Sequence, residues 1–486
     1  MKFYLTLVLA LLFVPHYSSA ANVQDLPDIG DSAGGVVSPE YERRLGQAVM
    51  RQIRQQGAMV QDPEVESYIQ SIGYQLVSNS DDNQIPFHFF VLNDPAINAF
   101  AAPGGVVGIN SGIFINAESE NELAGVMAHE ISHVTQRHMA RTFEAAGKFS
   151  LPMMAAMIGA IAIGIANPQA GQAAIAAVTG ASAQYQINFT RANEEEADRI
   201  GIKLMARAGF DPFGMPKFFE KLQQMSRYSG TNPPEFLLTH PLTTSRISES
   251  IARAEQYPPI DHKDSTSYKL VRAKITANSF DTPNDAVRFF EGKLTEGGYP
   301  DIETARYGYA IALTLANDFQ RAREQLKILL KNDPENIAYL LEAAKLESSQ
   351  RNFESALQIY QVAQKLYPDY RPVVMGYARA LLDAKQPEAA RDLLRNYDRD
   401  HESDLVYYDL LSQAEAETGA PVESSIDKAE YYYLIGGTKQ AIDHLKFAQH
   451  QNKLTYHQEE RIKARLAQLE DELELEKDMN LQQDKN

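Results

Sequence analysis

The chain has 486 residues, 44% of them hydrophobic and 23% charged, so it carries enough apolar material for more than one domain core. The formal net charge of −18 provides no basic surface, which argues against a nucleic-acid partner. The chain holds no cysteine. This excludes a disulfide scaffold, a thiol nucleophile, a thiolate metal site and a lipid anchor on an N-terminal cysteine.

The first twenty residues are typical of a secretory signal peptide. Met1 and Lys2 give a short positive start, an apolar run extends to Val14, and small residues before Ala21 form a cleavage point. The apolar run is shorter than the ~20 residues that span a bilayer. The sequence therefore predicts a signal peptide over residues 1–20, a mature protein in the periplasm, and an irregular segment over residues 21–38.

Helix and strand patterns alternate in the next part of the chain. Apolar residues at spacing four predict a helix from Glu40 onward, and a second helix is expected over residues 63–77. The apolar run at residues 86–92 predicts a strand. Residues 98–110 predict two strands joined by a Pro-Gly-Gly turn, followed by a turn at residues 111–112.

A long helix is expected next. Ser119 is its N-cap candidate because Glu122 stands three residues later, and the helix is expected to run to about Ala146. Residues 149–190 carry no charged residue. Their two apolar parts are short and rich in Gly and Ala, which leaves three interpretations: two membrane spans, two helices that cover a functional site, or helices that contact a membrane surface or a partner.

The C-terminal part of the chain repeats with a period of 34 residues. Small residues recur where the two helices of a hairpin approach closely, and prolines recur at the ends of second helices. The three series are Pro300, Pro334 and Pro368; Ala310, Ala344 and Ala378; and Ala322, Ala356 and Ala390. The pattern resembles the tetratricopeptide repeat, whose arrays present a concave face to peptides or partner proteins, although a purely structural helical domain also fits. Ala441 indicates one more degenerate unit, and a charged helix over residues 456–477 is expected to cap the array.

The pattern His-Glu-x-x-His, which begins at His129 and ends at His133, predicts a metal site. Residues four apart on a helix lie on one face, so both imidazoles can reach one ion. Glu130 lies beside them and can take a proton from a metal-bound water. A catalytic zinc ion usually has three protein ligands, so one more is needed. His138 lies about 140° around the helix from His133 and is expected to be a surface residue.

The acidic segment at residues 191–198 offers the third ligand. Glu194 and Asp198 lie four residues apart, on one face of a helix. An acidic helix start is often only a favourable dipole arrangement. Beside the histidine motif, the segment predicts that Glu194 binds zinc with the two histidines. Asp198 is then expected to accept a hydrogen bond from a zinc-bound histidine and fix its tautomer. One Zn²⁺ per chain is expected.

Three motifs in this order resemble one group of zinc peptidases, which includes the heat-shock membrane protease X and the CAAX prenyl proteases. The motifs are Asn98-Ala99-Phe100-Ala101-Ala102-Pro103-Gly104-Gly105, residues 129–133, and residues 194–198. The resemblance covers about residues 39–253 and implies a zincin-type metallopeptidase domain. Integral members of the group carry clear transmembrane helices, and their absence from this sequence favours a soluble relative.

The resemblance also implies roles for further residues. It implies an edge strand that binds substrate by strand addition, although an ordinary hairpin explains the same pattern. The residues of this strand are Val106, Val107, Gly108, Ile109 and Asn110. It implies that His240 approaches the zinc from a loop, either as a fourth ligand that blocks the open position or as an oxyanion donor. Arg246 is expected to steady the oxyanion or the substrate. Without the resemblance, a satisfied loop histidine and a surface arginine would explain these two residues equally well.

The sequence as a whole predicts an α-rich α+β chain. A zinc metallopeptidase domain with a small sheet is expected over residues 39–265, and an all-α tetratricopeptide solenoid with a C-terminal capping helix over residues 266–486. With the signal peptide, the chain resembles periplasmic members of the group that act on outer-membrane proteins.

This resemblance implies a zinc endopeptidase that degrades misfolded or stalled outer-membrane proteins and assists their assembly. Its clients would be unfolded or misassembled outer-membrane proteins, and its repeats would contact the barrel-assembly machinery. Two alternatives remain. One is a non-catalytic assembly chaperone or scaffold that docks clients through its repeats. The other is an integral inner-membrane protease anchored through residues 151–183. The intact zinc set favours catalysis.

Overall fold

The computed structural model describes residues 39–82, 85–146, 183–228, 233–296, 301–397, 404–451 and 454–483, with isolated residues between 156 and 174. The predicted signal peptide (1–20), the predicted irregular segment (21–38) and most of the uncharged segment 149–190 lie outside the described residues. Within the described residues, the structure contains no helix with the length and hydropathy needed to cross a bilayer.

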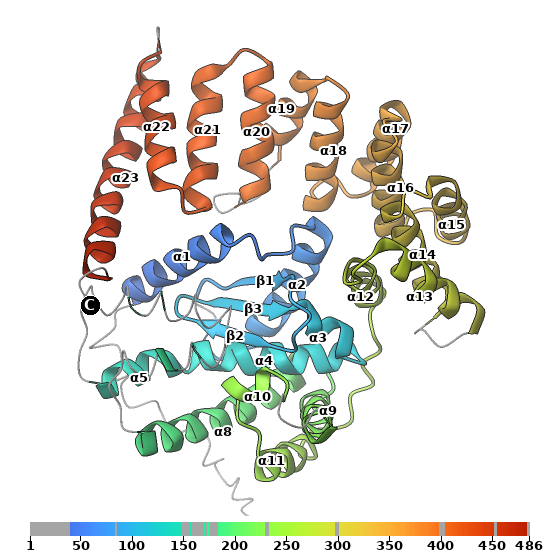
Figure 1. The fold of residues 1–486 in the computed structure, drawn as a ribbon, viewed down its shortest axis with the longest axis vertical. Helices are drawn as coiled ribbons and strands as arrows, with labels where there is room; N and C mark the ends of the chain where they lie inside the picture. The colour runs from blue at the N-terminus through green and yellow to red at the C-terminus, as the bar shows by residue number, and fades with distance from the viewer. Residues whose placement is uncertain are drawn as a thin grey trace, which may run out of the picture.

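A three-stranded sheet lies at the centre of the peptidase part, between helices (Figure 1). Its strands are β1 (His88–Leu92), β2 (Ala99–Ala102) and β3 (Val106–Asn110). The spatial order is β1-β3-β2, with β3 parallel to β1 and antiparallel to β2. Helix α1 (Pro39–Gln55) packs on one face of the sheet, against Phe90, Leu92 and Val106. Helices α2 (Pro63–Val77) and α4 (Glu120–Thr135) pack on the opposite face, against Phe89 and Val107.

The expectation that residues 106–110 form an edge strand is wrong. Val107 pairs with Phe89 of β1 on one side and with Ala101 of β2 on the other, so β3 is the central strand. Its backbone is paired on both sides, and every β3 residue is buried. A substrate chain therefore cannot add to β3.

Two other local expectations are also corrected. Residues 111–112 do not form a turn but begin the short helix α3 (Ser111–Asn116). The expected helix over residues 119–146 is two helices, α4 and α5 (His138–Ala146). Arg137 separates them with a φ of 51°, a left-handed conformation that a continuous right-handed helix does not contain. The N-cap at Ser119 is as predicted, since its side chain accepts a hydrogen bond from the Glu122 amide.

One hydrophobic core connects α2, the sheet, α4 and the later helices of the peptidase part. Those helices are α8 (Ala183–Arg207), α9 (Gly214–Tyr228), α10 (Phe236–Thr239) and α11 (Thr244–Ala254). Gly201 allows α8 to lie directly against α4, because a Cβ at this position would come within 3.2 Å of the Ala128 carbonyl. This close contact places the acidic turn of α8 beside the histidines of α4.

The C-terminal part is an array of helical hairpins. The helices are α12 (Thr266–Asn278), α13 (Pro283–Glu296), α14 (Ile302–Leu315), α15 (Phe319–Asn332), α16 (Ile337–Ser349), α17 (Phe353–Leu366), α18 (Arg371–Asp383), α19 (Pro387–Arg395), α20 (Leu405–Glu417), α21 (Pro421–Leu434), α22 (Thr438–Gln449) and α23 (Tyr456–Gln483). The alanines of the 34-residue series are fully buried between helices, as is Ala441. Helix α23 packs on α22 at the end of the array, which confirms the expected capping helix.

The array curves around the peptidase part and contacts both α1 and α2 (Figure 1). Three cations of this contact, Arg51 on α1, Lys274 on α12 and Arg371 on α18, are largely buried. Their carboxylate partners across the contact are Glu472 and Glu476 for Arg51, Asp62 and Glu64 for Lys274, and Glu66 for Arg371. We refer to these residues as the interdomain seam.

Candidate active site

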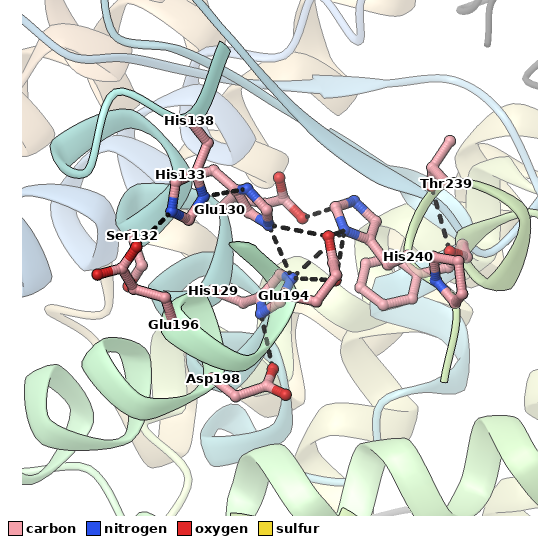
Figure 2. Close-up of polar contacts among 12 residues, drawn as sticks. His129, Glu130, Ser132, His133, His138, Glu194, Glu196, Asp198, Thr239 and His240 are labelled. Atoms are coloured by element: carbon pink, nitrogen blue, oxygen red, sulfur yellow. Dashed lines mark hydrogen bonds and ion pairs between the residues drawn. The ribbon is translucent and has the colours of Figure 1, made fainter. Parts of the chain in front are cut away.

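Four side chains from three helices converge below the sheet (Figure 2). Helix α4 contributes His129 and His133, α8 contributes Glu194, and His240 is the C-terminal cap of α10. One ligand atom from each residue lies within 4.8 Å of the others. The structure thus brings together the three zinc ligands predicted from sequence and the residue proposed as a fourth.

The ligand atoms face one another closely. His129 Nε2 lies 3.1 Å from His133 Nε2 and 3.3 Å from His240 Nδ1. Glu194 Oε1 lies 3.1 Å from His240 Nδ1 and 3.4 Å from His133 Nε2. His129 Nε2 also lies 3.3 Å from Glu194 Oε2, so these contacts cannot all be hydrogen bonds, because each ring nitrogen is either a donor or an acceptor. A divalent cation between them satisfies all four, so these residues fit a metal ion.

Burial and neighbouring charges shift the pKa values of these groups. Burial opposes the charged form of His129, but Asp198 and Glu194 raise its pKa to about 10. Burial lowers the pKa of His133 well below its usual range. Burial opposes the charge of Glu194 as well, but His240 and His133 hold its pKa well below the ordinary value. Because a metal-bound imidazole is deprotonated at its ligand nitrogen, metal binding would compete with a proton on His129.

Glu130 is a buried carboxylate that lies beside the ligand cluster without a hydrogen-bond partner among the described residues. Its side chain is 0% exposed, and neither carboxylate oxygen has a hydrogen-bond partner among the described residues. Oε1 lies 3.4 Å from His240 Nε2. Burial raises the pKa of Glu130 above its usual value. Unpaired buried carboxylates are costly, and they occur where a substrate or a water molecule completes the site.

Asp198 holds His129, as expected from sequence. Its Oδ1 lies 3.0 Å from His129 Nδ1, which leaves the Nε2 of that ring for the metal. Arg246 in turn binds Asp198 through Nε at 2.7 Å and Nη2 at 2.8 Å, and its Nη1 lies 3.0 Å from Glu194 Oε2. The buried guanidinium is thus occupied by these two carboxylates. This placement does not support the expected contact of Arg246 with an oxyanion or a substrate.

The expectation that His138 is a surface residue is wrong. Its side chain is 4% exposed, and its Nδ1 lies 2.8 Å from His133 Nδ1. The error came from the assumption of one continuous helix, because the left-handed Arg137 turns the chain so that α5 begins at His138 beside the ligand. Its Nε2 lies 3.2 Å from Glu196 Oε2. Burial lowers the pKa of His138.

Comparisons with known proteins agree with this geometry. Residues 63–254 match the model of peptidase family M48, and residues 310–371 and 349–414 match tetratricopeptide repeat models. The beta-barrel assembly-enhancing protease of Escherichia coli K12 is 38% identical over 456 residues, which are 94% of this chain and 93% of that protein.

Two further relatives extend this comparison. The Yersinia pestis protein of the same name is 37% identical over 471 residues, 96% of this chain and 97% of that protein. The mitochondrial metalloendopeptidase OMA1 of Schizosaccharomyces pombe is 27% identical over 220 residues, 43% of this chain and 60% of that protein. The chain therefore belongs to the family of β-barrel assembly-enhancing proteases, and it is a metalloprotease whose catalytic domain is of peptidase family M48.

Proposed function

We propose that this chain is a zinc endopeptidase of the periplasm that cleaves misfolded or stalled outer-membrane proteins and assists the assembly of others. The observation that carries the proposal is the convergence of His129, His133 and Glu194 beside the unpaired carboxylate of Glu130. The names of the relatives support the link to barrel assembly. The predicted signal peptide supports the periplasm.

Zinc held by His129, His133 and Glu194 would polarise the scissile carbonyl and lower the pKa of a bound water. Glu130 would serve as the general base that accepts a proton from the attacking water and returns it to the leaving amine, because its carboxylate has no hydrogen-bond partner among the described residues and burial raises its pKa. Asp198 keeps the lone pair of His129 on Nε2 by accepting a hydrogen bond from Nδ1.

We also propose that His240 restrains the enzyme in a resting state. Its Nδ1 lies with the three predicted ligands, while its Nε2 faces Glu130 at 3.4 Å. The ring therefore stands in the space between the metal ligands and the base, where water and the scissile carbonyl must sit. The competing role, a hydrogen-bond donor to the oxyanion, requires the ring to move away from Glu194 and Glu130.

Substrate strand addition, if this family uses it, requires an edge other than β3. Strand β2 pairs only with β3 in the described part of the chain, and it packs against α4, which carries the metal ligands. We therefore assign the substrate edge to β2 (Ala99–Ala102). This edge suits extended or unfolded chains, because main-chain hydrogen bonds supply the affinity.

The repeats are proposed to contact the barrel-assembly machinery, with the division between the two parts near residues 265–266. The uncharged segment 149–190 is proposed to contact a membrane surface. The rival function is a scaffold without catalysis, which the tetratricopeptide matches alone would allow.

Metal analysis of the purified full-length protein, combined with a casein digestion assay, separates the two functions. We expect about one zinc per chain and measurable cleavage, and His133→Ala should lose both. A wild-type protein that binds no zinc and leaves casein intact would contradict the proposal and leave the scaffold.

A further inference from the structure

We propose that His138 and Glu196 are positioning residues that fix the tautomer of the ligand His133, so that its Nε2 always presents a lone pair to the metal. The inference rests on the zinc site of the proposed function. Neither residue supplies a ligand atom: His138 contacts Nδ1 of His133, the ring nitrogen that does not face the other ligands, and Glu196 acts through His138 (Figure 2).

The contacts form a continuous chain. His133 Nδ1 lies 2.8 Å from His138 Nδ1, and His138 Nε2 lies 3.2 Å from Glu196 Oε2. Arg141 donates a 2.6 Å hydrogen bond to the same Glu196 oxygen. The His138 ring is 4% exposed, whereas Glu196 is 28% exposed. The chain of contacts thus runs from the buried metal ligand to a carboxylate near the surface.

The direction of each hydrogen bond follows from the end of this chain. An ionised carboxylate can only accept, so His138 must carry its proton on Nε2. A neutral imidazole then has its lone pair on Nδ1, which can only accept from His133. His133 therefore carries its proton on Nδ1 and keeps the lone pair on Nε2. That nitrogen is the one that faces His129 and Glu194.

The other histidine ligand of α4, His129, is also hydrogen-bonded on the side away from the metal, but without an intervening histidine. His129 meets the carboxylate of Asp198 directly, and Arg246 holds that carboxylate in place. His133 reaches Glu196 through His138, and Arg141 holds that carboxylate. The hydrogen-bond chain behind each of these two histidines thus ends at a carboxylate that is bound by an arginine. Partners of this kind orient a metal-bound histidine, and their loss typically weakens metal binding by about 10–100-fold.

The backbone of this region places His138 beside the ligand. Arg137 adopts a φ of 51°, a left-handed conformation that ends the right-handed helix α4. This turn is what brings His138 back against His133, since α4 ends at Thr135 and α5 begins at His138.

The test measures zinc affinity in full-length variants by competition with a chelator. His138→Phe keeps a planar ring but removes both hydrogen bonds, and Glu196→Ala removes the terminal acceptor from a partly exposed position. We expect both to weaken zinc binding by about 10–100-fold. His138→Gln carries one acceptor and one donor, and should recover most of the affinity. Glu195→Ala is the matched control for the loss of a helix carboxylate, and should bind zinc as the wild type does.

A second measurement does not depend on activity. Nitrogen-15 NMR of the metal-free protein should show the Nδ1–H tautomer for His133 in the wild type, and a mixture of tautomers in Glu196→Ala. Wild-type zinc affinity in both His138→Phe and Glu196→Ala would overturn the inference. So would an equal loss in His138→Phe and His138→Gln, because that result would indicate packing alone. Failure of the wild type itself to bind zinc would instead contradict the proposed function.

Discussion

The metal centre and the interdomain seam both bury charged side chains, but they arrange them in opposite ways. At the seam, each cation faces carboxylates: Lys274 lies near Asp62, Glu64 and Glu342, and Arg371 bridges Glu66 and Asp404. At the metal centre, ring nitrogens face ring nitrogens, and the carboxylate of Glu130 faces no donor within hydrogen-bonding geometry.

This difference distinguishes charged groups that hold two parts of the protein together from groups that serve catalysis. Buried charges that are paired in the protein itself hold two surfaces together, since breaking such a pair leaves an uncompensated charge. Buried groups that the protein leaves unpaired carry a cost in stability, and they are retained where a ligand or a reaction completes them. Substitutions at the metal centre should therefore lower activity, and substitutions at the interdomain seam should lower stability.

The largest effect is expected for Glu130→Gln. Glutamine is close in shape but cannot accept a proton, so proteolysis should fall by roughly 10²–10⁴-fold or more. Zinc content and thermal stability should stay near wild type, because Glu130 is not a proposed ligand and has no hydrogen-bond partner among the described residues. Casein cleavage together with metal analysis measures both quantities. Wild-type cleavage by this variant would show that the base has been misassigned.

Lys274→Met tests the seam. The ammonium is buried among Asp62, Glu64 and Glu342, and its removal leaves carboxylates without a counter-charge. We expect the free energy of unfolding to fall by about 3–5 kcal/mol at pH 8, with the zinc site intact. Burial raises the pKa of Glu64 to about 7 even beside Lys274, and loss of the ammonium would raise this pKa further. The deficit should therefore shrink as the pH falls toward 7, where the carboxyl group of the variant binds a proton that the wild type does not yet bind, and it should level off below pH 7.

Two variants control this result. Lys331→Met removes an exposed lysine of α15 and should change stability little. Lys274→Met combined with Glu64→Gln removes one of the unpaired charges and should recover part of the loss at pH 8. A single variant as stable as the wild type would mean that the seam charges do not hold the array on the peptidase domain.

His240→Ala asks whether the metal centre is also held closed. If the ring blocks the site in about 90% of resting molecules, its removal should raise cleavage of an unfolded substrate about tenfold. If the ring donates to the oxyanion, the same change should lower the rate by roughly 10²–10³-fold. We expect the increase, because the ring lies between Glu194 and Glu130. An unchanged rate would assign His240 to neither role.

The sequence predicted the parts of the structure that depend on local spacing. The spacing of four residues on each of two helices predicted that His129, His133 and Glu194 lie together and that Asp198 contacts a ligand histidine. The 34-residue period predicted the repeats. The position of His138 was missed because one left-handed residue, Arg137, interrupts the helical periodicity. A non-glycine residue gives no sequence signal for that conformation.

Long-range pairing was the second limit. The central position of β3 depends on its parallel pairing with β1, and alternation within a strand is the same at the centre and at the edge of a sheet. The seam joins residues as far apart in sequence as Arg51 and Glu476. No periodic pattern connects them, so nothing in the sequence indicated that the array contacts the peptidase domain.

The smallest effect is expected within the array, at a buried pair of two carboxyl groups. Unlike the charges of the interdomain seam, these two groups carry the same sign when both are ionised. Asp427 lies against Glu415, and burial together with this neighbour raises its pKa to about 8. The folded state therefore binds a proton that the unfolded state loses near pH 4, so stability falls as the pH rises between about 4 and 8. Asp427→Asn stays neutral throughout. Its unfolding free energy relative to wild type should rise from near zero at pH 4.5 to about 1–3 kcal/mol at pH 8.5, or a few degrees in Tm.

Asp443→Asn, an exposed position on α22, should show no such trend in the same thermal unfolding series. A flat difference for Asp427→Asn would mean that Asp427 is ionised in the folded protein and compensated by Arg461, which lies 3.7 Å away.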